Sequence, residues 1–305
     1  MVNSTLYTNS TQMSLYKNSA VYNVWVGLVT LTVFCVCFFL YFISVILNVY
    51  FTTPHVREHA RYVLFAHMLI NDALYLIVGL LLMLGYLFTT HLPVPICYFL
   101  ITLAVSTFMV TPYNLAAMAL ERYIAICFPL RHITLCTPQR CNAAIGLMWA
   151  TGMIPNFADF IALSTSVDTK FFSSRLLCTQ GHMIRSQLQA TIRSVSFILT
   201  LTMVGLVLIF TYIKVMVVAR QIGSGNSSAL KAAKTVLLHA FQLLLCMTSL
   251  TTSFTESSYK DYVAFLIVTN FLVFMCLPRF LSPLIYGLRD EVFSKCIRKM
   301  YSSKF

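Results

Sequence analysis

Two opposite charges lie inside long apolar segments of the chain, where an ionised side chain is costly. Asp72 falls within the apolar segment 60–88, and Arg279 falls within the apolar segment 262–287. Ionisable groups in such surroundings by default pair with each other or mark a functional site. We therefore expect Asp72 and Arg279 to form an ion pair, the alternative being that Arg279 faces water or a backbone carbonyl oxygen.

A second charged group, Glu121-Arg122-Tyr123, lies near the end of another apolar segment, 97–127. Neighbouring charges at the end of an apolar helix are either an anchor at the membrane interface or a contact for another protein. The residues alone leave both interpretations open.

The residue groups that enzymes and metal sites need do not occur. The 10 cysteines and 7 histidines show neither zinc-ligand spacing nor a His-Glu-x-x-His motif. We therefore expect no catalytic residues, no metal and no cofactor.

The composition indicates that the chain is surrounded by lipid. The chain has 305 residues, of which 59% are hydrophobic and only 10% charged, and its mean hydropathy is +0.81. Soluble domains carry about 25% charged residues, so too few remain here to cover a water-facing surface. The apolar segments are long and do not alternate, which favours transmembrane helices over a barrel. The predicted fold class is an all-α integral membrane protein.

Seven apolar segments approach or exceed the roughly 20 residues that a helical crossing needs. They are 24–51, 60–88, 97–127, 142–163, 192–219, 233–255 and 262–287. We predict a polar N-terminal segment over 1–23, a seven-helix bundle within 24–288, and a tail over 289–305 that carries a short amphipathic helix on the membrane surface. A transporter would show repeated halves, which the sequence lacks.

The positive charges predict the orientation. Connections on one side of the membrane carry 14 of the Lys and Arg residues, and those on the other side carry 6. The richer side is expected to be cytoplasmic, which places the N-terminus outside and the C-terminus inside. Glycosylation sequons at Asn3 and Asn9 agree with an external N-terminus. We assign the net charge of +12 to this asymmetry and not to nucleic-acid binding.

With this orientation, Cys97 and Cys178 are the two cysteines that face the oxidising side. Two such cysteines in one oxidising compartment suggest a disulfide. We expect it to hold the outer connection over the mouth of the bundle.

Several motifs occur in order along the whole chain. Residues 118–127 read Met-Ala-Leu-Glu-Arg-Tyr-Ile-Ala-Ile-Cys, and Cys97 lies 25 residues before Arg122. The later motifs are Lys231-Ala232 with Thr235 and His239, and Ser282-Pro283-Leu284-Ile285-Tyr286. This set resembles the odorant-receptor family of rhodopsin-like (class A) G-protein-coupled receptors. Glu121 replaces the family's usual Asp and Ser282 its usual Asn, a pattern closest to divergent fish odorant receptors.

The resemblance implies how the receptor is activated. Glu121 would hold Arg122 at rest, and Arg122 would then meet the C-terminal helix of a heterotrimeric G protein that raises cAMP. In most relatives the Asp at the position of Asp72 binds a sodium ion. We expect Arg279 to supply this positive charge here and to displace the sodium. The further coupling residues that the resemblance implies are Tyr123, Tyr212, His239, Pro283 and Tyr286.

The resemblance also implies a small-molecule odorant site between the helices. Family position assigns to it Ala104, Val105, Phe108, Met109, Ser196, Thr200, Met247, Thr251, Phe254, Leu272 and Met275. We expect Asp159, Arg193 and Glu256 to lie at solvated loop edges, the alternative being that they recognise a charged odorant. A class A receptor for a peptide, lipid or other internal ligand, outside olfaction, is the alternative function.

Overall fold

The computed structural model describes residues 19–221, Leu237, Ala240, Phe241, Leu244, 263–277, Arg279 and Phe280. The predicted sixth segment, apart from four single residues, and the predicted tail lie outside this set. So do several predicted site residues, namely Asn3, Asn9, His239, Met247, Thr251, Phe254, Glu256, Pro283 and Tyr286.

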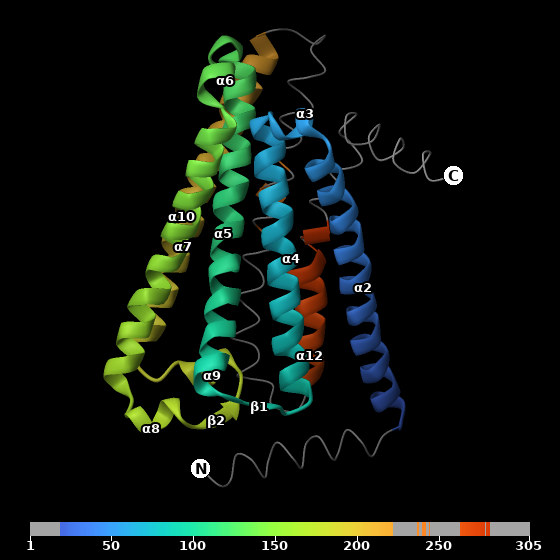
Figure 1. Cartoon of the computed structure of the whole chain (residues 1–305), viewed down its shortest axis with the longest axis vertical. Helices are drawn as coiled ribbons and strands as arrows, with labels where there is room; N and C mark the ends of the chain where they lie inside the picture. Colours follow the sequence, from blue (N-terminus) through green and yellow to red (C-terminus); the bar gives the residue numbers. More distant parts are fainter. Residues whose placement is uncertain are drawn as a thin grey trace.

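Long helices side by side make up the molecule (Figure 1). The first five predicted segments are confirmed as helices, and the seventh is helical from residue 263. Their bounds are α2 Ser19–Thr52, α4 Ala60–Leu87, α5 Val94–Cys127, α7 Pro138–Ser166, α10 Gln187–Gln221 and α12 Val263–Asn270, which continues as the π-helix η2 Phe271–Cys276.

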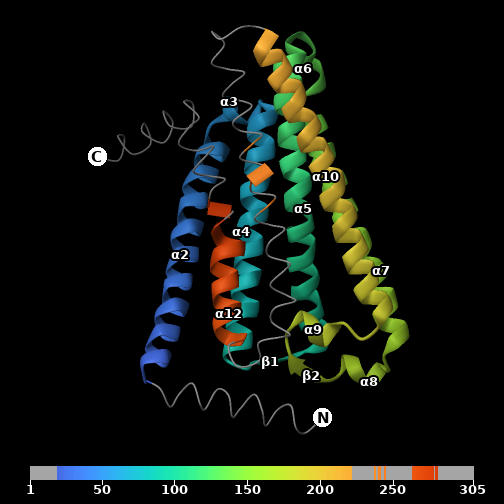
Figure 2. The same cartoon turned by 180° about the vertical axis from the view of Figure 1, so that it is seen from behind.

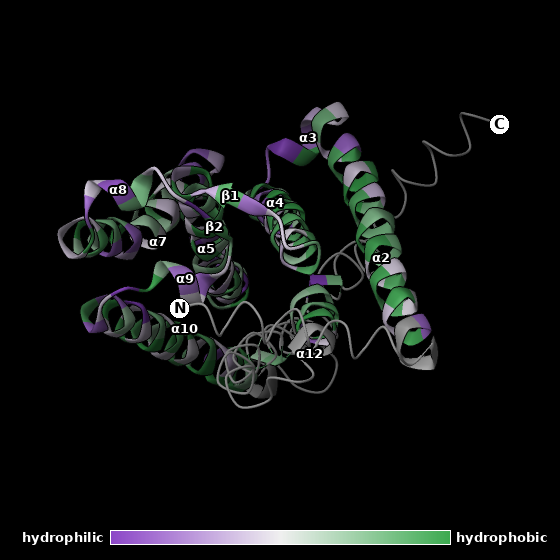
Figure 3. Cartoon of the chain, turned by 90° about the horizontal axis from the view of Figure 1, so that it is seen from below, coloured by the Kyte–Doolittle hydropathy of each residue, from purple (hydrophilic) through white to green (hydrophobic). Residues whose placement is uncertain are grey.

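Four of the described helices, α2, α4, α5 and α10, are long and apolar enough to cross a membrane. The helix α7 has 29 residues and packs in the same bundle, but it is less apolar. Large apolar side chains face outward along these helices, among them Phe34, Phe99, Leu147 and Met203. Figure 3 shows hydrophobic residues along the helices and hydrophilic residues at α8 and β1. An outward apolar surface of this kind fits lipid as the surrounding solvent.

The helix α5 packs against α4, α7 and α10 and so lies at the centre of the described bundle. Glycines bring neighbouring helices close at two points. A Cβ atom at Gly152 of α7 would lie 3.2 Å from Val110 Cγ2 on α5, and one at Gly79 of α4 would lie 2.7 Å from Phe271 Cε2 on η2. In lipid the hydrophobic effect does not drive helices together, so their association relies on van der Waals packing, and small residues allow the close approach that this packing needs.

Short elements close the two ends of the bundle (Figure 2). At one end, here called the disulfide end, the strand β1 His91–Pro93 pairs antiparallel with β2 Arg175–Leu177, next to the helices α8 Thr169–Phe172 and α9 Gln180–Met183. At the other, the Arg122 end, lie α3 Pro54–Arg57 and α6 Pro129–Leu135. The sequence did not predict the strand pairing, because the two strands lie far apart in the chain.

We predict that Gly79→Ala destabilises the bundle, because the added methyl group would overlap the Phe271 ring. Overpacking of this kind costs about 1–3 kcal/mol. The measurement is the thermal unfolding midpoint of the purified protein in detergent.

Gly85→Ala is the matched control, since it lies on the same helix and a Cβ atom there would meet nothing within 4 Å. Alanine is favoured over glycine within a helix, so this variant should be as stable as the wild type or slightly more so. Equal midpoints for the two variants would contradict the close approach of α4 and η2.

Candidate functional site

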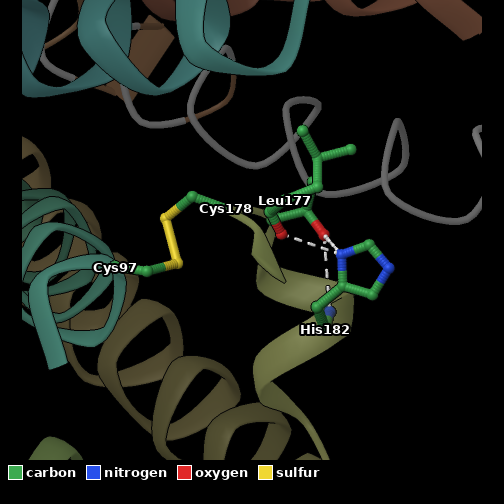
Figure 4. Close-up of a disulfide and its surroundings, with 5 residues drawn as sticks. Cys97, Leu177, Cys178 and His182 are labelled. Atoms are coloured by element: carbon green, nitrogen blue, oxygen red, sulfur yellow. Dashed lines mark hydrogen bonds between the residues drawn. A yellow bond between two sulfur atoms is a disulfide. The ribbon is translucent and has the colours of Figure 1, made fainter. Parts of the chain in front are cut away.

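The disulfide end is held together by the predicted bond between Cys97 and Cys178, which joins α5 to the connection after β2 across 81 residues. Figure 4 shows the bond beside Leu177, the last residue of β2. His182 on α9 lies with Nδ1 2.9 Å from the carbonyl oxygen of Leu177, to which it can only donate. The connection is therefore folded compactly over this end of the bundle.

Asp159 of α7 and Arg193 of α10 form a buried ion pair beneath this connection. Arg193 donates from Nε and Nη2 to the two carboxylate oxygens at 2.8 and 2.7 Å. Asp159 is only 2% exposed, and it also accepts from the Tyr98 hydroxyl and, at 3.4 Å, from Gln189 Nε2. The expectation of solvated loop edges was therefore wrong for Asp159 and Arg193. The cause is that α10 begins at Gln187, five residues before the predicted span at 192. Arg193 therefore lies in the second turn of the helix and not at its end.

The predicted ligand residues of α5 and α10 face each other across an aromatic contact. The ring of Phe108 stacks on that of Phe197, with centroids 5.7 Å apart and planes at 17°. The side chains of Ala104, Val105 and Ser196 are half-buried, and Met109 is buried. Thr200 is buried too, with its hydroxyl 2.8 Å from that of Tyr113.

The same row of rings continues to the segment after α12. Tyr75 of α4 lies 6.0 Å from Phe108, centroid to centroid, and donates a hydrogen bond from its hydroxyl to Met275 Sδ. Leu272 and Met275 are half-buried on η2. Tyr75 and Phe197 were not predicted as site residues. The signal for Phe197 was its place four residues after Arg193 and three before Thr200, on one helix face.

The structure brings Asp72 and Arg279 together in the middle of the bundle. Arg279 Nε lies 3.3 Å from Asp72 Oδ1, and the two side chains are 1% and 0% exposed. The guanidinium also donates to the Met275 carbonyl oxygen at 3.0 Å and to Thr111 Oγ1 at 3.5 Å, and its carbon lies 3.7 Å from the Tyr75 ring centre. The ion pair and the carbonyl contact, which the sequence presented as alternatives, therefore occur together.

The π-helix η2 ends three residues before Arg279, and the sequence did not predict it. An extra residue in a helical turn rotates the residues that follow, and π-helical turns are frequent at functional sites. Helical spacing alone therefore does not fix the direction in which Arg279 points.

At the Arg122 end, Glu121 has two basic side chains as neighbours. Arg122 Nε lies 3.7 Å from Glu121 Oε2, while His132 Nε2 on α6 lies 3.1 Å from Glu121 Oε1. The Tyr123 ring contacts Phe128 and Phe210 edge-on, and Tyr212 packs on Val215. Burial, together with the Glu121 carboxylate, raises the pKa of the Cys136 thiol, which stays neutral here. The sequence analysis did not identify His132 as a site residue. Its contact with Glu121 depends on the helix α6, which turns the chain back after α5.

The profile of a family described as "7 transmembrane receptor (rhodopsin family)" matches residues 44–286. The chain is 32% identical to Odorant receptor 131-2 of Danio rerio over 247 residues, which cover 78% of this chain and 75% of that receptor. It is 27% identical to Olfactory receptor 10P1 of Homo sapiens over 193 residues, 61% of either chain. It is 26% identical to Olfactory receptor 6K3 of Homo sapiens over 198 residues, 61% of this chain and 57% of that one. The match thus spans about three-fifths of the two human receptors.

We predict that Arg279→Ala reduces the amount of folded receptor, because it leaves the Asp72 carboxylate buried without its partner. Removing one partner of a buried pair costs about 3–5 kcal/mol. Cell-surface quantity, measured by an N-terminal epitope tag, is the readout. The double variant Asp72→Asn/Arg279→Met, which buries no charge, should recover much of the lost surface signal.

Arg140→Ala removes a similar but exposed cation and is the matched control, with surface quantity close to that of the wild type. If the double variant were as poorly displayed as Arg279→Ala, the pairing of the two charges would not be the cause of the loss.

Proposed function

The chain belongs to the odorant receptors of the rhodopsin family of seven-transmembrane receptors, and we propose that it detects a small extracellular molecule between its helices and activates a heterotrimeric G protein, raising cAMP. One observation carries the proposal. A single bundle holds a row of aromatic rings on α4, α5 and α10, and the Glu121-Arg122 pair at the Arg122 end.

The disulfide and the charges support the proposed orientation in the membrane. A disulfide persists in an oxidising compartment, so the disulfide end faces outward. The first residues of α2 lie at this same end (Figure 1), which puts the N-terminus outside, with Asn3 and Asn9 as glycosylation sites. The Arg122 end then faces the cytoplasm, in agreement with the larger number of Lys and Arg residues on that side. We also propose that the tail 289–305, which lies outside the described residues, forms the predicted amphipathic helix on the inner membrane surface.

The wall between α5 and α10 has the composition of a small-molecule site. Such sites are mostly apolar, with a few polar groups that orient the ligand. Here Val105, Phe108 and Met109 supply the apolar side, and the hydroxyl groups of Ser196 and Thr200 supply polar atoms. Family position adds Met247, Thr251 and Phe254, which lie outside the described residues, to the proposed site.

Arg122 is the residue that meets the G protein. Its contact with Glu121 is long, at 3.7 Å, and its side chain is 17% exposed, so this ion pair by itself contributes little stabilisation. His132 lies closer to Glu121 and can hold the carboxylate when Arg122 leaves. Tyr212 and Tyr286 are its neighbours in the active state, and Tyr123, His239 and Pro283 belong to the same coupling region.

Arg279 takes the place of the sodium ion that most relatives bind at the helix-two aspartate. Its guanidinium reaches both Asp72 and Thr111, and it is itself fully buried. A covalently attached cation cannot exchange with the medium, so the receptor's signalling is independent of sodium concentration.

We predict that Arg122→Ala abolishes the cAMP response while surface display persists, because the cation that meets the G protein is removed far from the folding core. The measurement is cAMP in a reporter cell, normalised to a surface epitope signal. Arg131→Ala, an exposed cation at the same end, is the matched control and should signal like the wild type. Agonist-driven cAMP that survives in Arg122→Ala at equal display would count against the proposed coupling.

We predict that Phe108→Ala weakens agonist potency, because it removes one ring of the stacked pair that forms the wall. Lost aromatic contacts of about 1–3 kcal/mol correspond to roughly a tenfold or larger rise in the agonist concentration for half-maximal response. Phe99→Ala on the same helix is the control, since Phe99 is 64% exposed on the lipid-facing surface. Equal potency shifts in the two variants would refute a ligand wall at Phe108. A panel in which peptides or lipids, and no volatile or water-soluble odorants, activate the receptor would favour the non-olfactory alternative.

A further inference from the structure

A partly buried guanidinium with one unused donor lies where α5, α7 and α10 meet. Arg193 gives Nε and Nη2 to Asp159, but its Nη1 atom is buried and has no hydrogen-bond partner among the described residues. A buried donor without an acceptor costs about 1–3 kcal/mol, and more when it is charged. An oxygen acceptor from a bound molecule would remove this cost.

A network of hydrogen bonds around Asp159 fixes the position of the Arg193 guanidinium. Asp159 Oδ1 accepts from Arg193 Nε and Gln189 Nε2, and Asp159 Oδ2 accepts from Arg193 Nη2 and the Tyr98 hydroxyl. Gln189 is held in turn, because its Oε1 accepts the backbone N–H groups of Arg185 and Ser186. The guanidinium is thus oriented before any ligand arrives, which lowers the entropic cost of binding.

Arg193 lies on the face of α10 that carries the proposed ligand wall. Ser196, Phe197 and Thr200 follow it by three, four and seven residues, which places all four side chains on one helix face. Phe197 stacks on Phe108, and Thr200 contacts Tyr113, so this face is turned toward α5. One helical turn, about 5.4 Å, separates Arg193 from Phe197. The charged group therefore stands at the disulfide end of an aromatic wall.

The Nη1 atom of Arg193, which has no hydrogen-bond partner among the described residues, favours a negatively charged ligand. Both oxygens of Asp159 already accept two hydrogen bonds each, so the pair has little to offer an ammonium group. Nη1 is a cationic donor, and it forms its strongest bond with an anionic oxygen.

We propose that Arg193 anchors the ligand and that the ligand is an organic acid: an apolar or aromatic body, which packs on Phe108 and Phe197, with a carboxylate that accepts from Nη1. The proposal rests on the function proposed above and deepens it by naming the class of ligand. Glu256, the third charge that the sequence placed at this mouth, lies outside the described residues.

The test compares matched molecules on the full-length receptor in cAMP reporter cells. The probes are medium-chain alkanoic acids and phenylalkanoic acids, together with the alcohols and amines of the same carbon skeletons. Acids should activate at concentrations at least about tenfold below those of the alcohols and amines, the equivalent of one charge-assisted hydrogen bond. Alcohols or amines that match the acids, or acids that fail to activate a receptor whose basal cAMP is intact, would overturn the proposal.

Arg193→Gln should raise the half-maximal concentration of the acids about tenfold or more and leave that of the alcohols nearly unchanged. Ser194→Ala, an exposed neighbour on the same helix, is the control. Because Arg193→Gln also leaves Asp159 unpaired, the exchange Asp159→Arg/Arg193→Asp provides a second variant, in which the ion pair remains but the guanidinium moves to α7.

The exchanged variant should reach the surface with basal cAMP and lose its preference for acids. A preference for acids that survives the exchange shows that the pair is structural and overturns the anchor. If the exchanged variant is not displayed, the wild-type comparison of acids with alcohols still decides. Failure of the proposed coupling is separate, since it appears as a basal cAMP signal that Arg122→Ala does not lower.

Discussion

Carboxylates buried in an apolar bundle need cations from the protein itself, and the described part of this chain meets that need three times. Asp72 pairs with Arg279 in the middle of the bundle, Asp159 with Arg193 at the disulfide end, and Glu121 with Arg122 at the opposite end, where His132 also contacts Glu121. Lipid cannot solvate these charges, so each pair also fixes which helices are neighbours. The Asp72–Arg279 pair joins α4 to the segment after α12, and the Asp159–Arg193 pair joins α7 to α10. The contact between His132 and Glu121 joins α6 to α5.

The three pairs differ in how tightly they are held, and the difference agrees with their proposed roles. The Asp159–Arg193 contact is bidentate at 2.7 and 2.8 Å and is supported by Gln189. The Asp72–Arg279 contact is supported by a backbone carbonyl and by the Tyr75 ring. The Glu121–Arg122 contact is the longest and lies at the exposed end. Rigid charges such as those of the first two pairs suit the positioning of a ligand or a core.

The aromatic row from Tyr75 through Phe108 to Phe197 lies between two of these pairs. The Arg279 guanidinium packs on Tyr75 at one end of the row, and Arg193 lies one helical turn beyond Phe197 at the other. A ligand on this wall would therefore contact side chains that also pack around the central ion pair.

The sequence by itself determined the solvent and the order of the helices, because hydropathy and chain length are local properties. Its motifs also identified the cysteines of the disulfide and the charged group around Arg122. Only the tertiary structure decided that Asp159 pairs with Arg193, that His132 reaches Glu121, that β1 pairs with β2, and that η2 precedes Arg279. Each of these depends on where a helix begins or turns relative to a neighbour distant in the chain. A shift of one residue rotates a side chain by about a quarter of a helical turn, and no local pattern records it.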